Sequence, residues 1–497
     1  MRTRHVVATT VALSGLLAAG TALGGDNNFA DVQQDGGSNS ASVDQDVGVR
    51  HQTYLKQNIG PNSATVTQIS NSNSPYFTPQ GNRFGRAGDY ALQQGSSNTL
   101  VLTQSFVGNN GNEVGTSGQG FEQTGNNNDA TILQYGSRNL ALEVLQSDGN
   151  KLSVTQGRAG SGYLSNYAYN RINSIKQTNT GGAQNQATII QQGVADAGVM
   201  NKIGSLVQSG SGNDVQLTQT GKRNALGTVS QQTTGNHISL SITGNYNGSD
   251  GVDALNEQVI GSFATLSRGF TAASAVTQGS VIQNGSNNQL DYVITGNNNL
   301  FGFSQTSSNN IVGGSIGSSR NQLTISQTAT GGTGHSEATV NISGGDYNDI
   351  AVGQSIGGGT KLAVATIDVD GSNNSLNVVQ GQIGNGRNSL IDVSIDGDFN
   401  NSVKLFTTGN AAYQALGNSS HRLAGSGQIQ QGGSGNQLTY DLTGSYNQFA
   451  FYQTSTNNTI VGSTVGNNSQ TVVNQTGPNN TANFSQFGGG NVMGVMQ

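Results

Sequence analysis

A seven-residue pattern, Asn-x-apolar-x-apolar-x-Gln, recurs along nearly the whole chain and constrains the fold more than any other feature. It is seen in NSATVTQ from Asn62, NTLVLTQ from Asn98 and NQLTISQ from Asn321. A connector x-Gly-x-x often completes a period of 11, as between Asn299, Asn310 and Asn321. Alternation with period two is typical of a β-strand, so the Asn, both apolar residues and the Gln face one side. A glycine two residues after the Gln tolerates a tight turn.

Each period therefore predicts one strand and one turn, and two periods make a strand-turn-strand hoop of about 22 residues. Such hoops stack about 4.8 Å apart, which predicts an all-β, cross-β solenoid in which identical residues lie above one another. A buried amide costs about 1–3 kcal/mol when unpaired, whereas a stack pairs the carbonyl of each side chain with the NH₂ of the next. We therefore expect the bracketing Asn and Gln to form amide ladders that fix the register.

The residues expected in these ladders are Gln45, Asn62, Gln68, Asn98, Gln104, Asn128, Gln134, Asn139, Asn150, Gln156, Asn213, Gln219, Asn224, Asn299, Gln305, Asn321, Gln327, Asn447, Gln453, Asn480 and Gln486. The glycines expected to allow the turns are Gly95, Gly125, Gly136, Gly210, Gly221, Gly296, Gly444 and Gly477. Some copies end in an apolar residue instead of Gln, as in NHISLSI from Asn236 and NQLTYDL from Asn436.

The chain divides into a leader and one long repeat region. Residues 1–24 read as a secretory signal peptide, with Arg2 and Arg4 before an apolar run and small residues at the end. Residues 25–497 form the predicted repeat region, with irregular insertions near 69–90, 157–172, 246–280 and 409–430 that we interpret as loops or irregular hoops. No apolar run is long enough for a membrane-spanning helix, so we expect a secreted protein without membrane insertion.

Composition narrows the alternatives. The chain has 74 Gly but only 4 Pro and 9% charged residues, whereas disordered chains of similar polarity are usually rich in charge and proline. A disordered polar linker is also disfavoured by the strict spacing. The net charge is −6 and becomes −8 once Arg2 and Arg4 leave with the signal peptide, which argues against a nucleic-acid partner.

The sequence contains no motif that is typical of a catalytic or cofactor site. Without cysteine, thiol nucleophiles and cysteine metal sites are excluded, and we expect the four histidines of the mature chain to lie on the surface or in turns. The stretch from Asp368 departs from a calcium loop at Asn373 and Val379. Asp392, Asp396 and Asp398 could bind calcium weakly, but a solvated strand face is favoured. We therefore expect no enzyme activity, no cofactor and no metal.

Aromatic residues fall into two groups. Phe301, Phe303, Phe449 and Phe451 occupy inward positions of the repeat, so core packing is favoured over ligand stacking. A second group, in the irregular early segment, could contact a partner or a secretion factor, although an ordinary loop is favoured. This group consists of Tyr76, Phe77, Arg83, Phe84 and Arg86.

The extended pattern Gln-x-Gly-x-x-Asn-x-apolar-x-apolar-x-Gln resembles the curlin repeat, the building unit of curli fibres on bacterial surfaces. It is carried by Gln93/Gly95/Asn98/Gln104, Gln123/Gly125/Asn128/Gln134 and Gln208/Gly210/Asn213/Gln219, and also by Gln34/Gly36/Asn39/Gln45 and Gln475/Gly477/Asn480/Gln486. The resemblance covers roughly residues 30–490. It implies a functional amyloid that passes unfolded through an outer-membrane pore, with accessory factors, and assembles with itself or other curlin-like subunits into biofilm matrix and adhesive fibres. By the same resemblance, the stacked Asn and Gln support fibre growth.

The chain departs from curlin subunits in length, because it has room for on the order of 20 hoops at the predicted period. Three functions therefore remain open: a curli-like fibre subunit or fibre-associated protein, a monomeric β-solenoid adhesin with capped edges, and a β-helical carbohydrate-active enzyme. The last needs clustered carboxylates on one face, which the repeat does not provide.

Overall fold

The computed structural model describes residues 21–23, 28–46, 50–70, 81–106, 111–117, 120–157, 170–193, 201–248, 276–330, 336–357, 362–381, 389–401 and 427–497. This part of the chain contains no helix and forms about 14 turns of a parallel β-solenoid, with about 26 residues per turn. The predicted fold class is confirmed. The expected hoop of 22 residues occurs where no insertion intervenes, as from Gln453 to Gln475, and insertions lengthen other hoops, as from Gln68 to Gln104. The chain forms two compact units, Met1–Ile238 and Ser239–Gln497, called unit 1 and unit 2 below.

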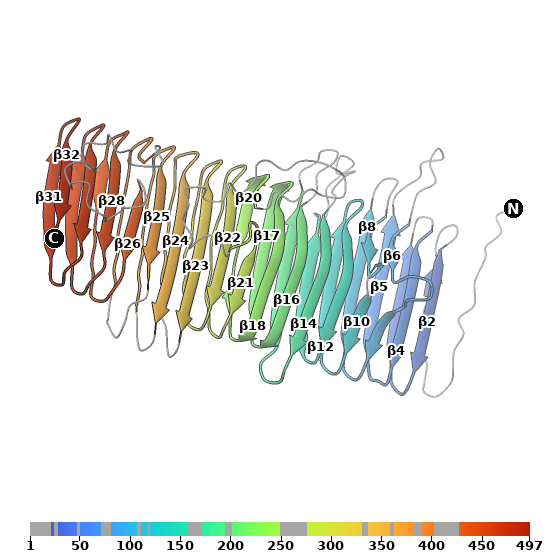
Figure 1. Cartoon of the computed structure of the whole chain (residues 1–497). Coiled ribbons are helices and arrows are strands. Elements are labelled where there is room, and N and C mark those ends of the chain that lie inside the picture. Colours follow the sequence, from blue (N-terminus) through green and yellow to red (C-terminus); the bar gives the residue numbers. More distant parts are fainter. Residues whose placement is uncertain are drawn as a thin grey trace. The chain divides into compact units, whose positions relative to one another are not determined.

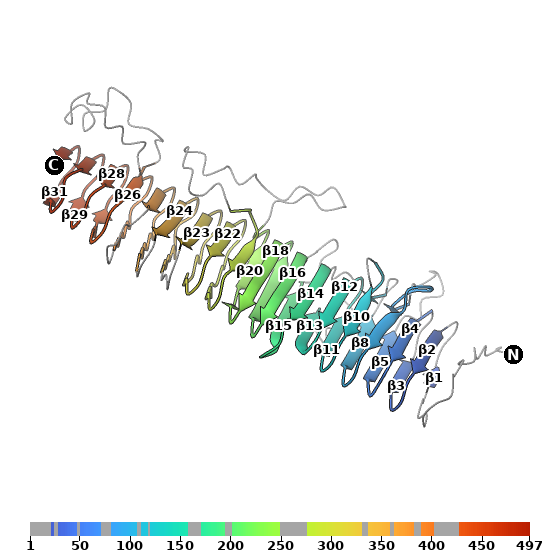
Figure 2. The same ribbon diagram turned by 60° about the horizontal axis from the view of Figure 1, so that its bottom comes forward.

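Unit 1 consists of two parallel sheets whose strands alternate along the chain (Figures 1 and 2). Sheet A contains β1 (Thr21–Leu23), β3 (Ser40–Asp46), β5 (Ser63–Ser70), β8 (Thr99–Phe106), β11 (Asp129–Tyr135), β13 (Asn150–Gln156), β15 (Asn185–Gln192), β17 (Asp214–Lys222) and β19 (His237–Ile238). Sheet B contains β2 (Phe29–Asp35), β4 (Gln52–Asn58), β6 (Arg83–Phe84), β7 (Ala91–Gln94), β9 (Glu113–Val114), β10 (Phe121–Thr124), β12 (Leu140–Ser147), β14 (Arg171–Asn179), β16 (Lys202–Ser211) and β18 (Ala225–Thr234).

The register places equivalent repeat positions directly opposite one another. Ile132 pairs with Leu102 on one side and with Val154 on the other, and Gln134 pairs with Gln104 and Gln156. This is the stacking of like residues that the alternating pattern predicts.

Unit 2 has one long run of strands and a less regular opposite side. The long run contains β21 (Val281–Asn284), β22 (Leu300–Thr306), β23 (Gln322–Thr330), β24 (Asp349–Gly357), β25 (Ser375–Gln380), β26 (Gln428–Gln431), β28 (Gln448–Gln453), β30 (Gln470–Gln475) and β32 (Val492–Met496). On the opposite side the unit begins with β20 (Ser241–Asn245), whose Thr243 bridges Thr295. In the described residues this side has further regular strands at its other end, namely β27 (Asp441–Thr443), β29 (Thr459–Val465) and β31 (Thr481–Phe487). Between these ends, isolated bridges link Ser336, Ala363 and Ser389.

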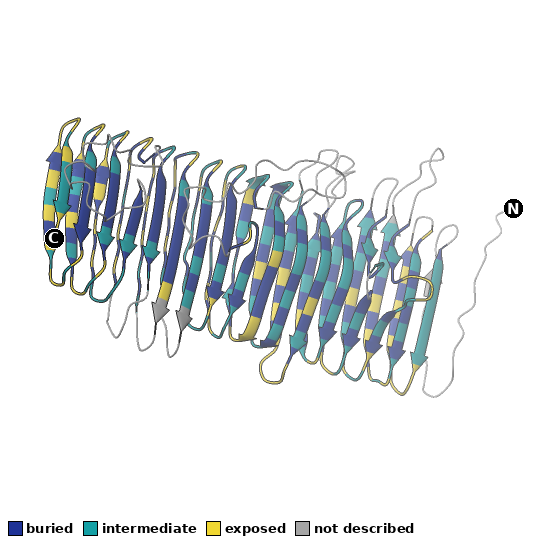
Figure 3. Cartoon of the chain, in the orientation of Figure 1, coloured by how far each residue is buried: buried dark blue, intermediate teal, exposed yellow. Residues whose placement is uncertain are grey.

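The core of each unit is a thin layer of inward side chains. Burial alternates along strands such as β3 and β11. Figure 3 shows the same alternation as bands of colour along the strands that face the viewer. The four predicted core residues Phe301, Phe303, Phe449 and Phe451 are buried, and Tyr292 and Tyr440 pack against them. Alternation therefore identifies the core correctly even though this core is bracketed by amides.

Several predicted segments lie partly outside the described residues. These include residues 1–20 and 24 of the expected signal peptide, and 71–80, 158–169, 249–275 and 402–426 within or beside the expected insertions. Tyr76 and Phe77 lie there too. Phe84 is not a surface contact residue but is buried against Phe121, while Arg83 and Arg86 form ion pairs with Glu113 and Asp89 at 3.5 and 2.8 Å.

In the described part of the chain, no helix has the length and apolar character needed to cross a membrane.

Candidate functional site: the amide ladders

A continuous glutamine ladder runs along sheet A of unit 1. Each side-chain Nε2 donates to the Oε1 of the next glutamine at 2.7–2.9 Å. The ladder passes through Gln45, Gln68, Gln104, Gln134, Gln156, Gln191 and Gln219, all of them buried. The same Nε2 groups donate to backbone carbonyls of sheet B, as Gln104 does to Arg83 and Gln134 to Glu113, both at 3.2 Å. Each glutamine thus links one hoop to the next and also links the two sheets.

A second glutamine ladder runs along sheet B and was missed by the sequence prediction. Its Nε2 to Oε1 distances are 2.6–2.9 Å. It contains Gln34, Gln57, Gln93, Gln123, Gln146, Gln177, Gln208 and Gln231. The sequence signal was present, because several of these are the first Gln of the extended repeat pattern. These glutamines lie at the end of a sheet B strand, after which the chain turns into sheet A.

Among its described residues, unit 2 has one complete glutamine ladder. It passes through Gln283, Gln305, Gln327, Gln354, Gln380, Gln431, Gln453, Gln475 and Gln497. The opposite column is apolar and buried over Ile294, Ile316, Ile342, Val369, Ile395 and Leu442. Near the C-terminal end that column becomes polar again, where Gln486 accepts hydrogen bonds from Thr464 and Thr471 at 3.1 and 2.6 Å.

The asparagines are also stacked and form the expected side-chain bonds at many places, as Asn128 Nδ2 donates to Asn98 Oδ1 at 3.0 Å, and they add bonds to the backbone. The Oδ1 of one Asn accepts the backbone N–H of the next, as from Asn128 to Asn98 at 3.1 Å and from Asn321 to Asn299 at 2.9 Å. The Nδ2 commonly donates to a backbone carbonyl in the turn, as from Asn98 to Gly125 at 2.9 Å. The shorter Asn side chain sits where the turn enters the strand, so it satisfies turn backbone groups that would otherwise be unpaired.

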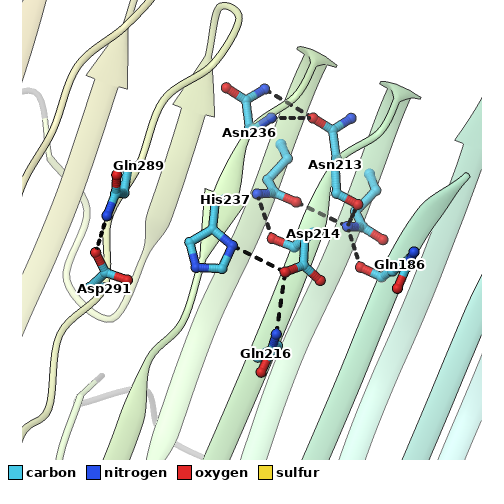
Figure 4. A network of polar contacts seen from close by, with 10 residues as sticks. Gln186, Asn213, Asp214, Gln216, Asn236, His237, Gln289 and Asp291 are labelled. Carbon is cyan, nitrogen blue, oxygen red and sulfur yellow. Dashed lines mark hydrogen bonds and ion pairs between the residues drawn. The ribbon is translucent and has the colours of Figure 1, made fainter. Parts of the chain in front are cut away.

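The predicted asparagines occupy four corners. Asn62, Asn98, Asn128, Asn150 and Asn213 share one corner of unit 1, and Asn139 and Asn224 belong to the other. In unit 2, Asn299, Asn321 and Asn447 share one corner and Asn480 belongs to the other. Figure 4 shows the end of the first corner, where both the backbone N–H and Nδ2 of Asn236 donate to Asn213 Oδ1 at 3.1 Å.

The turns need left-handed backbone at two places. Seven of the eight predicted glycines have φ between 75° and 118°, whereas Gly477 lies in a turn without a positive φ. A Cβ on Gly210 would lie 1.7 Å from the Thr233 carbonyl oxygen, so the close approach also requires glycine. The second left-handed residue, which the prediction missed, directly precedes the ladder Asn; examples are Asn127, Asn298 and Asn479, with φ of 58–59°. Asn tolerates this conformation better than most residues, which explains the frequent Asn-Asn pairs.

His51 replaces an asparagine in one corner of unit 1. Its backbone N–H donates to Asn28 Oδ1 at 3.0 Å, and its Nδ1 accepts the backbone N–H of Asn82 at 3.1 Å. The expectation of a surface or turn histidine is wrong here, because the ring is buried and makes an edge contact with Phe106. His237, by contrast, is partly exposed and lies 3.1 Å from Asp214 (Figure 4).

Ionisable groups near these columns do not form a metal cluster within the described residues. Burial raises the pKa of the Tyr292 and Tyr440 phenols. Burial also raises the pKa of the Asp368 carboxyl, with further contributions from Asp370, Asp396 and Asp392. The arrangement is suited to holding parallel hoops in register.

These features define a parallel β-solenoid built on amide ladders. The family model described as the curlin associated repeat matches the chain at residues 25–58 and 125–157. The chain therefore carries curlin associated repeats at these two places, as its repeat pattern predicts. No curated protein matches the chain.

Proposed function

We propose that this chain is an extracellular structural protein, a curli-type fibre subunit or fibre-associated protein that contributes to biofilm matrix and adhesion. The observation that carries the proposal is the polarity of the glutamine ladders. In each of them the Nε2 of the earlier glutamine donates to the Oε1 of the later one, as in Gln45 to Gln68 and Gln453 to Gln475. A ladder of this kind ends in an acceptor on its first glutamine and a donor on its last.

The first hoop carries such an acceptor. Gln45 Oε1 is buried and has no hydrogen-bond partner among the described residues. The backbone of β1 pairs with Val43–Gln45 on this edge, and β1 belongs to the expected signal peptide. Cleavage of that peptide would expose the edge of β3, because its pairing partner would be lost.

The last described hoop carries a glutamine donor, on the ladder that passes through unit 2. Gln497 Oε1 accepts from Gln475 at 2.8 Å, while its Nε2 donates to the Thr481 carbonyl at 3.1 Å. An Nε2 has two N–H groups, so Gln497 retains a donor for a further hoop. The side chains of Phe487 and Met496 in the two final strands are exposed.

These ends favour head-to-tail addition of a second curlin-like subunit. The donor of a last glutamine can bind the acceptor of a first glutamine in the next copy, and the backbone of the new hoop pairs with the open strand. Because the two surfaces differ, the contact is heterologous and generates an open filament. By family resemblance, an outer-membrane pore and accessory factors would deliver the chain to the cell surface before it folds.

Seeded assembly tests the proposal. The mature chain is diluted from denaturant, and thioflavin-T fluorescence is followed together with sedimentation, with and without preformed seeds. We expect a lag that seeds shorten and a cross-β reflection near ~4.7 Å in the sedimented material. Prompt refolding to a soluble monomer that ignores seeds would refute it.

A variant of the final strand separates fibre growth from folding. The N–H of Gln497 donates to the Asn474 carbonyl, so alternation along β32 directs the N–H of Met496 away from β30. Met496→Pro removes this outward donor, and we expect seeded growth to slow at least tenfold while the circular dichroism of the monomer is unchanged. Met496→Ala is the matched control and is expected to grow normally.

The monomeric adhesin remains the second candidate because each unit satisfies its ladders internally. Within unit 1, six consecutive Gln-to-Gln bonds connect Gln45 to Gln219 without another molecule. A soluble, seed-insensitive chain that still binds surfaces would favour this function.

A further inference from the structure

One corner of unit 2 carries aromatic side chains at a position that otherwise suits asparagine. The residue preceding each ladder Asn is left-handed there, with φ of 57–62°. In chain order these residues are Tyr246, Asn298, Arg320, Tyr347, Asn373, Phe399 and Tyr446, and Asn468 holds the same place before Ser469. We call Tyr347, Phe399 and Tyr446 the aromatic row. A bulky side chain in this backbone conformation costs about 1–2 kcal/mol, which Asn largely avoids.

Folding does not account for the aromatic row. The exposed fractions of Tyr347, Phe399 and Tyr446 are 51%, 38% and 55%, whereas Phe301 and Phe449 in the core are fully buried. The row therefore gains little from burial and lies in an unfavourable backbone conformation. Residues that break a local rule without a compensating gain in stability point to a function.

The geometry of the row suits flat ligands. The rings of Phe399 and Tyr446 are stacked, with centroids 5.1 Å apart and planes inclined by only 3°. The Arg320 guanidinium lies 5.1 Å from the centre of the Tyr347 ring. Asn373 interrupts the row, so Tyr347 and Phe399 are separated by two strand spacings, about 9.6 Å. Rings one strand spacing apart, such as those of Phe399 and Tyr446, stack on each other, so Asn373 occupies the position where one more ring would complete the row.

Two carboxylates flank this interruption. Asp346 precedes Tyr347, and its Oδ1 accepts the Ser319 N–H at 2.8 Å. Asp398 precedes Phe399, and its Oδ1 accepts the Ser372 N–H at 2.7 Å. These bonds fix both carboxylates, and within the described residues the second oxygen of each has no hydrogen-bond partner. Each can therefore accept a hydrogen bond from a ligand hydroxyl.

We propose that the aromatic row, with Asp346 and Asp398, binds a neutral glycan chain. A pyranose ring would lie over Asn373 with its apolar faces toward Tyr347 and Phe399 and its hydroxyls toward the two carboxylates. This combination of apolar ring faces and fixed acceptors is typical of sites for polar ligands with apolar faces. The proposal does not depend on fibre formation.

The surface chemistry favours a glycan over other occupants. The carboxylates repel anionic polymers such as nucleic acid. The centres of protein interfaces are depleted of Asp and Glu, whereas both carboxylates here lie directly beside the rings. A neutral, hydroxyl-rich chain satisfies the rings and the carboxylates together.

Retention of the full chain on insoluble cellulose and chitin, with titration by soluble β-glucan, tests the proposal. The triple variant Tyr347→Asn/Phe399→Asn/Tyr446→Asn introduces the residue found at neighbouring corners, so we expect an unchanged circular dichroism spectrum and at least tenfold weaker binding. The matched control is Val293→Asn/Val461→Asn, which removes two exposed apolar side chains outside the row and should bind like the unmodified chain.

A second variant tests where the sugar ring lies. Asn373→Phe completes the row with a ring of the protein, so we expect it to weaken binding as strongly as the triple variant. Unchanged binding by Asn373→Phe would overturn that placement. The proposal as a whole is overturned if the unmodified chain binds none of the three glycans, or if the triple variant binds them as well as the unmodified chain. It is also overturned if the triple variant changes only the association between copies.

Discussion

Gln134 offers the sharpest test of how an amide ladder stabilises the solenoid. Its Nε2 donates to Gln156 Oε1 at 2.7 Å, and its Oε1 accepts from Gln104 Nε2 at 2.8 Å. Gln134→Leu keeps a similar volume but leaves one buried acceptor on Gln156 and one buried donor on Gln104 without a partner. At about 1–3 kcal/mol for each group, we expect a loss of about 2–6 kcal/mol in the free energy of unfolding.

The ladder model makes a further, non-additive prediction. Replacing Gln104, Gln134 and Gln156 together by Leu again interrupts the ladder at only two groups, now on Gln68 and Gln191. The triple variant also loses three side-chain bonds to backbone carbonyls of sheet B, whereas the single variant loses the one to Glu113. We therefore expect the triple variant to lose clearly less than three times the stability that the single variant loses. The apolar column of unit 2 shows that a column can also be built from apolar side chains without amides.

Urea unfolding of the full chain, together with hydrogen exchange of the amides in β11, measures both variants. Thr131→Leu is the control, because Thr131 lies on the same strand, is only partly exposed and faces outward; it should change stability by less than about 0.5 kcal/mol. A triple variant that loses about three times as much stability as the single variant would refute the reasoning. Each glutamine would then contribute independently, and the continuous ladder would have no special role.

Three further predictions concern individual side chains. The raised pKa of the Asp368 carboxyl, caused first by burial and then by Asp370, Asp396 and Asp392, means that folded unit 2 binds this proton more tightly than the unfolded chain. Stability should therefore fall as the pH rises above the ordinary value of 3.8, so Asp368→Asn should raise the melting temperature at pH 7 but not at pH 3. The hydrogen bond to Asp31, followed by burial, raises the pKa of Tyr90 to about 12; ultraviolet titration should show this, and Asp31→Asn should lower it toward 10.0. Asn127 has φ of 58°, so Asn127→Val should cost about 1–2 kcal/mol and Asn127→Gly much less, as measured by urea unfolding.

The sequence was sufficient to predict the strand period, the inward face and the parallel stacking. Alternation alone places Ile132 and Val154 in the core and Gln134 and Gln156 in one column. These features depend only on local spacing, which a stack repeats by translation.

The sequence alone does not predict which residues become neighbours along each column. Successive glutamines in one ladder are separated by 23 residues from Gln45 to Gln68 but by 36 residues from Gln68 to Gln104. Insertions of different length determine which repeats become neighbours, so the apolar column of unit 2 is visible only in the structure. His51 was missed for another reason: its Nδ1 accepts a backbone N–H as an Asn Oδ1 does, although its residue type suggests a polar surface.

The two kinds of column have different consequences for the backbone. A ladder glutamine also bonds across the solenoid, as Gln57 does to the Ser40 carbonyl at 3.1 Å and Gln123 to the Thr99 carbonyl at 3.0 Å. In the hoops that carry the apolar column of unit 2, that column makes no such bonds, and the backbone beside it has positive φ at Asp291, Asp368 and Asp396. Apolar packing is non-directional, so it buries the column without fixing the strand. We infer that the amide ladders keep the strands extended as well as in register, and that the positive φ values at Asp291, Asp368 and Asp396 occur because the column beside them lacks amides.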